Sequence, residues 1–208
     1  DNVYQTHCQL QLNAKKVVNL NLTIRNWLVG CYIVEFEQNG EDRAQYGTRL
    51  LEEMAKKIKA KGIKGLDVRS LRSCRTFYNT YPQIRGSITP ELQKRLPISI
   101  RGSVTAELEK EYPISPETLL SQLSFTHFIE LIRFDDPLER LFYEVETIKN
   151  NWNVRELERA INTALYIRTG LSKNKEAIIS KFKNQKPAQS IDIIRDPCLL
   201  YTSDAADD

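Results

Sequence analysis

Basic side chains gather in one short part of the chain, between positions 56 and 75. The set comprises Lys56, Lys57, Lys59, Lys61, Lys64, Arg69, Arg72 and Arg75. Asp67 is the one acidic residue among them. Ammonium and guanidinium groups neutralise phosphates, and the planar fork of an arginine also matches the edge of a base. The pattern therefore indicates a nucleic-acid contact surface, although a basic face that meets only water has the same composition.

A similar local motif carries two further arginines. Residues 67–71 read Asp-Val-Arg-Ser-Leu and residues 153–157 read Asn-Val-Arg-Glu-Leu, in each case a helix-capping residue followed by Val-Arg-x-Leu. The arginine then lies on the first turn of the expected helix, beside an apolar pair that faces inward. Arg155 and Arg159 are therefore further candidate contacts, and two such helices in tandem favour nucleic-acid binding.

Catalytic chemistry has little support in the sequence. His7 and His127 are the only histidines, and neither has a neighbouring nucleophile or a metal-ligand spacing. His127 is expected to pack in a helix or contact a phosphate. A metal-dependent nuclease needs clustered carboxylates that hold Mg²⁺, and no such cluster is predicted here. We therefore expect no active site and no cofactor in this chain.

Helices are expected along most of the chain. The segment from about 13 to 81 repeats apolar residues every three or four positions, and its first inward face is expected to hold Val18, Leu22, Trp27, Leu28, Tyr32, Ile33 and Phe36. The β-branched run at 31–34 leaves a strand open there. Asn39-Gly40 should stop this element, a helix should follow at about 43–60, and Asp67 should cap the next one after Gly62 and Gly65. A last helix is expected at about 173–183.

Residues 123–159 read as three short helices with tight turns, which is the plan of a helix-turn-helix DNA reader. Asp135 and Asn153 stand where side chains would cap the second and third helices. An ordinary three-helix packing unit would have the same spacing.

Two stretches stand apart from these helices. Residues 85–99 and 101–115 align at a sixteen-residue offset with ten of fifteen positions identical, which predicts a duplicated linker. The tail at 198–208 matches the translation of a sequencing adapter, and the chain does not start with methionine, so we expect a fragment of a longer protein. Without the tail, the formal charge rises from +3 to +6, because Asp204, Asp207 and Asp208 are removed.

The expected fold is all-α, with two helical lobes that carry helix-turn-helix-like, winged-helix-related units joined by a linker. The boundaries are a first lobe at 1–82, the linker at 83–115, a second lobe at 116–187, the start of a further linker at 188–197, and the tail at 198–208. No run of residues is long and apolar enough to span a membrane. Unpaired cysteines fit a reducing compartment, so we expect a cytoplasmic protein.

The ordered motifs resemble the N-terminal domain of YhcG-type bacterial proteins. They include Gly65-Leu66-Asp67-x-Arg69-x-Leu71-Arg72, Arg75-x-Phe77-Tyr78-x-x-Tyr81-Pro82 and the stretch Trp152–Arg159. The resemblance implies that a C-terminal half outside this chain is a PD-(D/E)xK nuclease, which would need Mg²⁺. Residues 123–127 and 154–158 are also similar to the helix-turn-helix of ParB-type centromere-binding proteins.

Together these patterns predict a non-catalytic domain that targets an endonuclease to duplex DNA. The alternative is a protein-interaction or dimerisation module, which would form a homo-oligomer.

Overall fold

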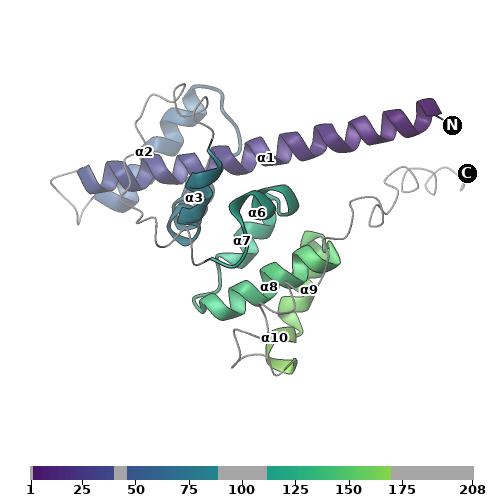
Figure 1. The fold of residues 1–208 in the computed structure, drawn as a ribbon. Coiled ribbons are helices and arrows are strands. Elements are labelled where there is room, and N and C mark those ends of the chain that lie inside the picture. Colours follow the sequence, from purple (N-terminus) through teal and green to yellow (C-terminus); the bar gives the residue numbers. More distant parts are fainter. Residues whose placement is uncertain (1, 40–45, 89–111, 170–208) are drawn as a thin grey trace, which may run out of the picture. The chain divides into compact units, whose positions relative to one another are not determined.

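The computed structural model describes residues 2–39, 46–88 and 112–169, and every regular element in these ranges is a helix (Figure 1). The elements are α1 (Asn2–Asn39), α2 (Tyr46–Ala60), α3 (Val68–Thr80), η1 (Pro82–Ser87), α6 (Pro116–Gln122), α7 (Phe125–Leu131), α8 (Pro137–Asn150), α9 (Val154–Asn162) and α10 (Leu165–Arg168). The all-α class is therefore confirmed. The lobe and linker boundaries stay predictions. Most of the duplicated repeat, the helix expected at 173–183 and the tail lie outside the described residues.

The chain divides into two compact units, and each is described by itself. One unit comprises Leu20–Arg133, and the other comprises Asp1–Asn19 with Phe134–Asp208. Within Leu20–Arg133, the second half of α1 packs against α2 and α3, and η1 contacts α6. Within the other unit, α8, α9 and α10 pack against one another.

Aromatic rings form the centre of the Leu20–Arg133 unit. Phe77 of α3 lies 4.6 Å from Phe128 of α7, measured between ring centroids, and Tyr81 lies 4.9 Å from the same ring. The indole Nε1–H of the buried Trp27 donates a hydrogen bond to the Tyr81 carbonyl oxygen at 2.8 Å. Gly30 of α1 provides the close approach to α3, because a Cβ at this position would lie 2.0 Å from the Cys74 carbonyl oxygen. A helix interior normally disfavours glycine, and here the packing explains it.

The α8–α10 helices enclose a second apolar core. Phe142 and Tyr143 are buried on α8, Leu157 on α9 and Tyr166 on α10. The Tyr143 hydroxyl accepts a hydrogen bond from the Tyr166 backbone N–H at 3.4 Å, so the phenol is buried with a polar partner. Phe77, Tyr81 and Phe142, the aromatic residues of the two cores, are all almost completely buried.

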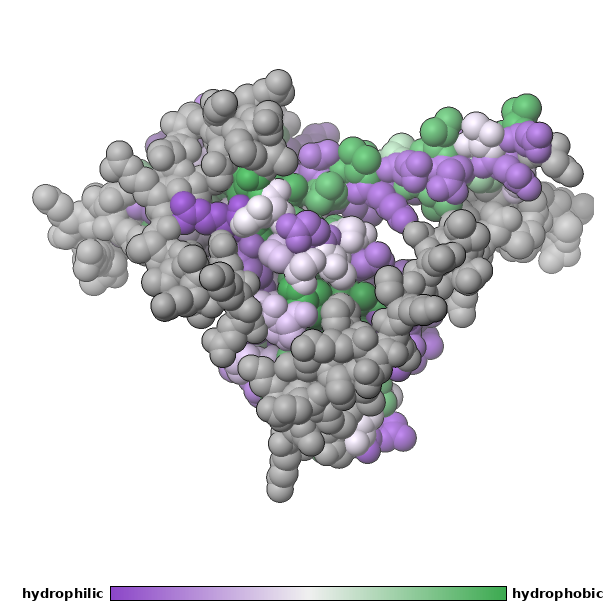
Figure 2. Space-filling model, viewed as in Figure 1, coloured by the Kyte–Doolittle hydropathy of each residue, from purple (hydrophilic) through white to green (hydrophobic). Residues whose placement is uncertain are grey.

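The 31–34 segment is helix, as expected for this stretch of the chain, so the strand that was left open there does not form. Two local predictions were wrong. Val18, Leu22 and Phe36 are exposed, because the buried stretch of α1 extends only from Thr23 to Ile33. Figure 2 shows apolar residues at the surface of the N-terminal part of α1.

The second wrong prediction concerns the cap of α8, which is Asp136 and not Asp135. The Asp136 carboxylate accepts a hydrogen bond from the Leu138 N–H at 2.9 Å, and Pro137 occupies the first turn. Proline has the backbone angle of a first helical residue already, so the residue directly before it becomes the cap. The caps predicted at Asp67 and Asn153 are confirmed.

Candidate nucleic-acid interface

A tight turn brings the basic residues of α2 and α3 into one helical hairpin. Helix α2 ends at Ala60, and Gly62 and Gly65 adopt φ values of 77° and 81°, which L-residues with a side chain rarely adopt. The Asp67 carboxylate then caps α3 by accepting a hydrogen bond from the Ser70 N–H at 2.7 Å. Two glycines and a cap thus connect the helices with few residues, and all of Lys56–Arg75 lies in this hairpin.

Seven of the eight predicted basic side chains on this hairpin are exposed. They are Lys56, Lys57, Lys59, Lys61, Lys64, Arg69 and Arg72, and we call this set the α2–α3 basic surface. The single carboxylate among them, that of Asp67, is engaged at the N-terminus of α3. Its hydrogen bonds to the Ser70 side chain and backbone lower the pKa of Asp67, so the cap is ionised at neutral pH. The surface therefore combines seven cations with one carboxylate that is already hydrogen-bonded.

An apolar cluster beneath the basic surface holds α2 and α3 on α1. Leu51, Ile33 and Leu71 are almost completely buried together, one from each helix. Met54, Ala55 and Ile58 line the same side of α2. Since these residues fix one side of the hairpin, the lysines of α2 occupy its remaining, solvent-facing sides.

Arg75 differs from the other basic residues of the hairpin. Its guanidinium donates a hydrogen bond to the Glu37 carboxylate of α1 at 2.9 Å, and its side chain is partly buried. This pair links α3 to α1 and offsets the charge. Arg75 therefore has a structural partner within the fold, whereas Arg69 and Arg72 have no hydrogen bond or ion pair of the same kind among the described contacts.

Helix α9 presents the second predicted pair of arginines. Asn153 and Glu156 form a reciprocal capping box, in which each side chain accepts a hydrogen bond from the other residue's backbone N–H at 3.1 and 2.8 Å. Leu157 and Ala160 are buried, while Arg155 and Arg159 are exposed. The apolar side of α9 thus holds the helix, and the arginines lie on its free side.

A shallow cavity lies next to these arginines. It has a volume of about 260 Å³ and is lined by Trp152, Glu156, Arg159, Ala160 and Thr163. No sequence motif predicted this cavity. The one signal for it was the position of Trp152 between two asparagines, Asn151 and Asn153, that end one helix and begin the next.

His127 has a structural role within its helix. Its ring Nδ1 accepts a hydrogen bond from the Ser124 backbone N–H at 3.1 Å and lies 2.8 Å from the Ser124 hydroxyl oxygen, which completes a capping box on α7. The imidazole is buried, so the expectation of a packing residue agrees with its position. Its contact with a phosphate stays a prediction.

The structure thus places the predicted contacts in two groups, the α2–α3 basic surface in one compact unit and Arg155 with Arg159 in the other. No three His, Cys, Asp or Glu side chains lie close enough to hold a metal ion within the described ranges. The Mg²⁺ implied by the family resemblance therefore has no fitting ligand set in this part of the chain. None of the described helices is sufficiently long and apolar to cross a membrane.

Comparison with known proteins agrees with the sequence motifs. Residues 2–168 match the family model of the DUF1016 N-terminal domain. The chain belongs to this family. It is also 31% identical over 193 residues to an Escherichia coli (strain K12) protein named "Putative nuclease YhcG", a match that covers 88% of this chain and 49% of that protein. This DUF1016 N-terminal domain chain therefore spans about half the length of its curated relative. No solved structure matches it.

Proposed function

We propose that this DUF1016 N-terminal domain binds duplex DNA and targets a nuclease to it. The α2–α3 basic surface is the observation that supports the proposal, because seven exposed cations on one short hairpin complement the charge of a phosphate backbone. The name of the Escherichia coli relative contains the word nuclease. In our proposal, cleavage belongs to the part of the protein outside this chain, and it occurs in the cytoplasm, where the DNA is.

Helices α7, α8 and α9 supply the helix-turn-helix part of the proposal. Three short capped helices in succession, the last carrying exposed Arg155 and Arg159, have the order of elements of such a reader. Arg155 lies on the first turn of α9, which is where a recognition helix contacts base edges. We therefore assign phosphate contacts mainly to the α2–α3 basic surface and base contacts to α9.

Binding of a fluorescent duplex, measured by anisotropy over a series of salt concentrations, tests the proposal. Each phosphate contact steepens the dependence of log K on log salt by about 0.9. Replacing Arg69 and Arg72 by alanine should therefore weaken binding and reduce the slope by about 2.

A matched double variant removes the same charge from arginines that have partners. Arg25 is hydrogen-bonded to the Asn26 side chain, and Arg133 is paired with Glu130. The Arg25→Ala/Arg133→Ala protein should bind almost as the parent does. Equal losses in both double variants would mean that net charge alone matters. If the parent protein bound no duplex at low salt, the proposal would be wrong.

Self-association through α1 is a second candidate function. Val3, Leu10 and Val17 recur every seven residues and are 85%, 62% and 55% exposed. Seven-residue spacing places them along one side of the helix, as in a coiled coil with a second copy of the chain. No carboxylate occurs between residues 2 and 25. Light scattering coupled to size exclusion tests this function: a dimer that Leu10→Asp/Val17→Asp converts to monomer supports it, and a monomeric parent protein excludes it.

A further inference from the structure

The cavity beside α9, lined by Trp152, Glu156, Arg159, Ala160 and Thr163, is called the Trp152 pocket below. Resting on the proposed DNA binding, we infer that the Trp152 pocket receives one unpaired base of a nucleic-acid strand. The domain would then prefer DNA with a bulged or otherwise unstacked nucleotide over fully paired duplex.

The backbone holds Trp152 in a fixed place between two helices. Asn151 adopts the left-handed conformation at the end of α8, with φ 48° and ψ 45°. The Trp152 N–H then donates a hydrogen bond to the Thr147 carbonyl oxygen at 3.0 Å, and Asn153 begins α9 as its cap. This is the bonding of a helix C-terminus that closes tightly. A backbone held in this way loses little conformational entropy when a ring stacks on the indole that it carries.

The chemistry of the pocket fits a flat ring better than a phosphate. Trp152 and Ala160 supply apolar surface, and Arg159 is the single cation among the lining residues. Glu156 also lines the pocket, and its carboxylate accepts the Asn153 N–H at 2.8 Å. A carboxylate so placed repels a phosphate but not a neutral base. Bases stack on aromatic side chains and on the guanidinium of arginine.

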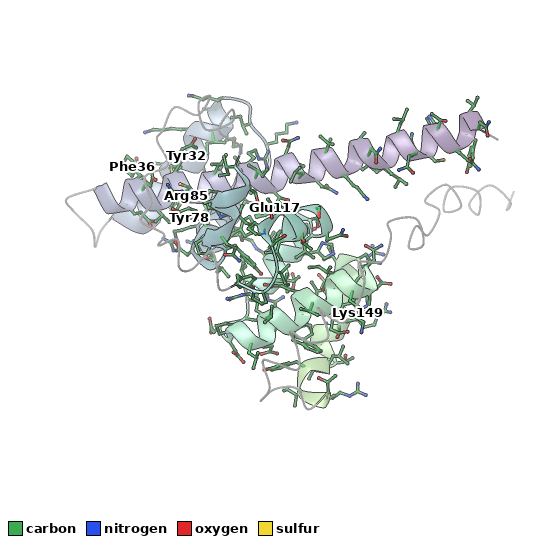
Figure 3. The ribbon with its side chains drawn as sticks, in the orientation of Figure 1. Tyr32, Phe36, Tyr78, Arg85, Glu117 and Lys149 are labelled. Carbon is green, nitrogen blue, oxygen red and sulfur yellow. The ribbon has the colours of Figure 1, made fainter. Side chains whose placement is uncertain are left out.

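Charged residues of both signs lie between 146 and 159, in the part of the chain that carries the pocket. Lys149 at the end of α8, labelled in Figure 3, is exposed, as are Arg155 and Arg159. Of the acids between 146 and 159, Glu146 accepts a hydrogen bond from the Asn150 amide and Glu156 caps α9, while Glu158 is exposed. Three cations thus stand against three carboxylates, so charge alone does not select the occupant, and the choice of a base rests on the proposed DNA binding.

The experiment compares three DNA duplexes of one sequence: fully paired, with a single bulged adenine, and with an abasic site at the bulge. The abasic duplex keeps the bent backbone and every phosphate, so it isolates the base. The 208-residue chain should bind the bulged adenine about tenfold more tightly than the abasic bulge. Trp152→Ala should abolish this preference and leave affinity for the paired duplex unchanged. Trp152→Phe should keep most of the preference, since it keeps an aromatic ring.

Fluorescence gives a second readout that does not depend on an alanine variant folding. The chain has two tryptophans, and Trp27 is only 1% exposed, so quenching by a stacked base reports on Trp152. The bulged adenine should quench emission in the parent protein, and the abasic duplex should not.

Several results would overturn the inference. Equal affinity for the bulged and abasic duplexes would reject the Trp152 pocket as a base site while leaving duplex binding intact. A preference that persists in Trp152→Ala would place the base elsewhere. Quenching by a tyrosine-containing peptide and by none of the DNAs would identify a protein-docking pocket instead. Failure to bind any of the three duplexes would reject the proposed function itself.

Discussion

Gly30 is the position where the packing of α1 on α3 can be tested most directly. A Cβ built on Gly30 would lie 2.0 Å from the Cys74 carbonyl oxygen, 2.7 Å from its carbon and 2.8 Å from the Tyr78 Cβ. Ordinary contacts of a Cβ begin at 3.4 Å. The obstacle is the backbone of α3, which cannot rotate away as the end of a side chain can. Gly30→Ala must therefore move the two helices apart.

The size of the effect follows from two opposing terms. The shortest contact must lengthen by 1.4 Å, from 2.0 to 3.4 Å, and such overpacking costs about 3 kcal/mol at the upper end of its usual range. Alanine is the better helix former, which stabilises the folded variant by about 1 kcal/mol. We expect a net loss of about 2 kcal/mol, which for a domain of this size lowers the melting temperature by about 4–8 °C.

Urea unfolding followed by tryptophan fluorescence measures this loss. In a Trp152→Phe background the signal comes from Trp27, whose ring centroid lies 4.8 Å from that of Tyr78, so its emission also reports on the α1–α3 contact. Gly86→Ala is the matched control, because a Cβ at Gly86 meets nothing within 4 Å. It should change stability by less than about 0.5 kcal/mol. If Gly30→Ala were as stable as Gly86→Ala, α1 and α3 could not approach each other as the structure shows.

Three further predictions concern the caps and the thiols. Asn153→Ala removes the capping box of α9 and should cost about 1 kcal/mol in thermal unfolding, and no change would contradict the box. Hydrogen bonding lowers the pKa of Asp67 below 3.8, so its stabilising effect is complete above that pH and is lost as the pH falls through the folded pKa. Asp67→Asn, which can still cap, should therefore lose less stability on acidification in urea titrations, whereas parallel curves would refute the linkage. Burial raises the pKa of Cys31 to about 11 and of Cys74 to about 12. In a Cys8→Ser/Cys198→Ser protein at pH 8, Ellman's reagent should therefore react with both thiols after unfolding and with neither before it, and fast native reaction would disprove their burial.

Local interactions were the part of the fold that the sequence predicted best. Capping joins residues three positions apart, so the side-chain types at Asp67 and Asn153 were sufficient to locate two helix starts. The cap of α8 could also have been predicted from local sequence, because Pro137 marks the first turn of the helix and makes Asp136 the cap. At α7, Ser124-x-x-His127 has the spacing of a capping box with histidine in place of glutamate, so the start of this helix could also have been located from the sequence.

Burial along α1 was beyond a local pattern. Helical periodicity tells which side chains share a face, but it does not tell how far the partner helices extend. Trp27 and Ile33 lie where α3 and α2 pack, whereas Val18 and Leu22 share the same kind of spacing without that cover. The Trp152 pocket was not predicted, since its lining residues all lie between 152 and 163 and have the ordinary spacing of one helix face.

The contrast between Arg75 and its neighbours bears on the choice between a nucleic-acid surface and a merely solvated one. Arg75 is paired with Glu37, and its charge contributes to the packing of α3 on α1. The seven cations of the α2–α3 basic surface have a single carboxylate in their midst, and that carboxylate caps a helix. Like charges held close together on a short hairpin repel one another and lower the stability of the folded state. The hydrophobic cluster and the caps hold the hairpin without these charges, and the exposed Glu52 and Glu53, four residues before Lys56 and Lys57, offset only part of the repulsion. A polyanionic partner would relieve the remaining repulsion, which is a physical argument for the proposed DNA binding over a surface that faces only water.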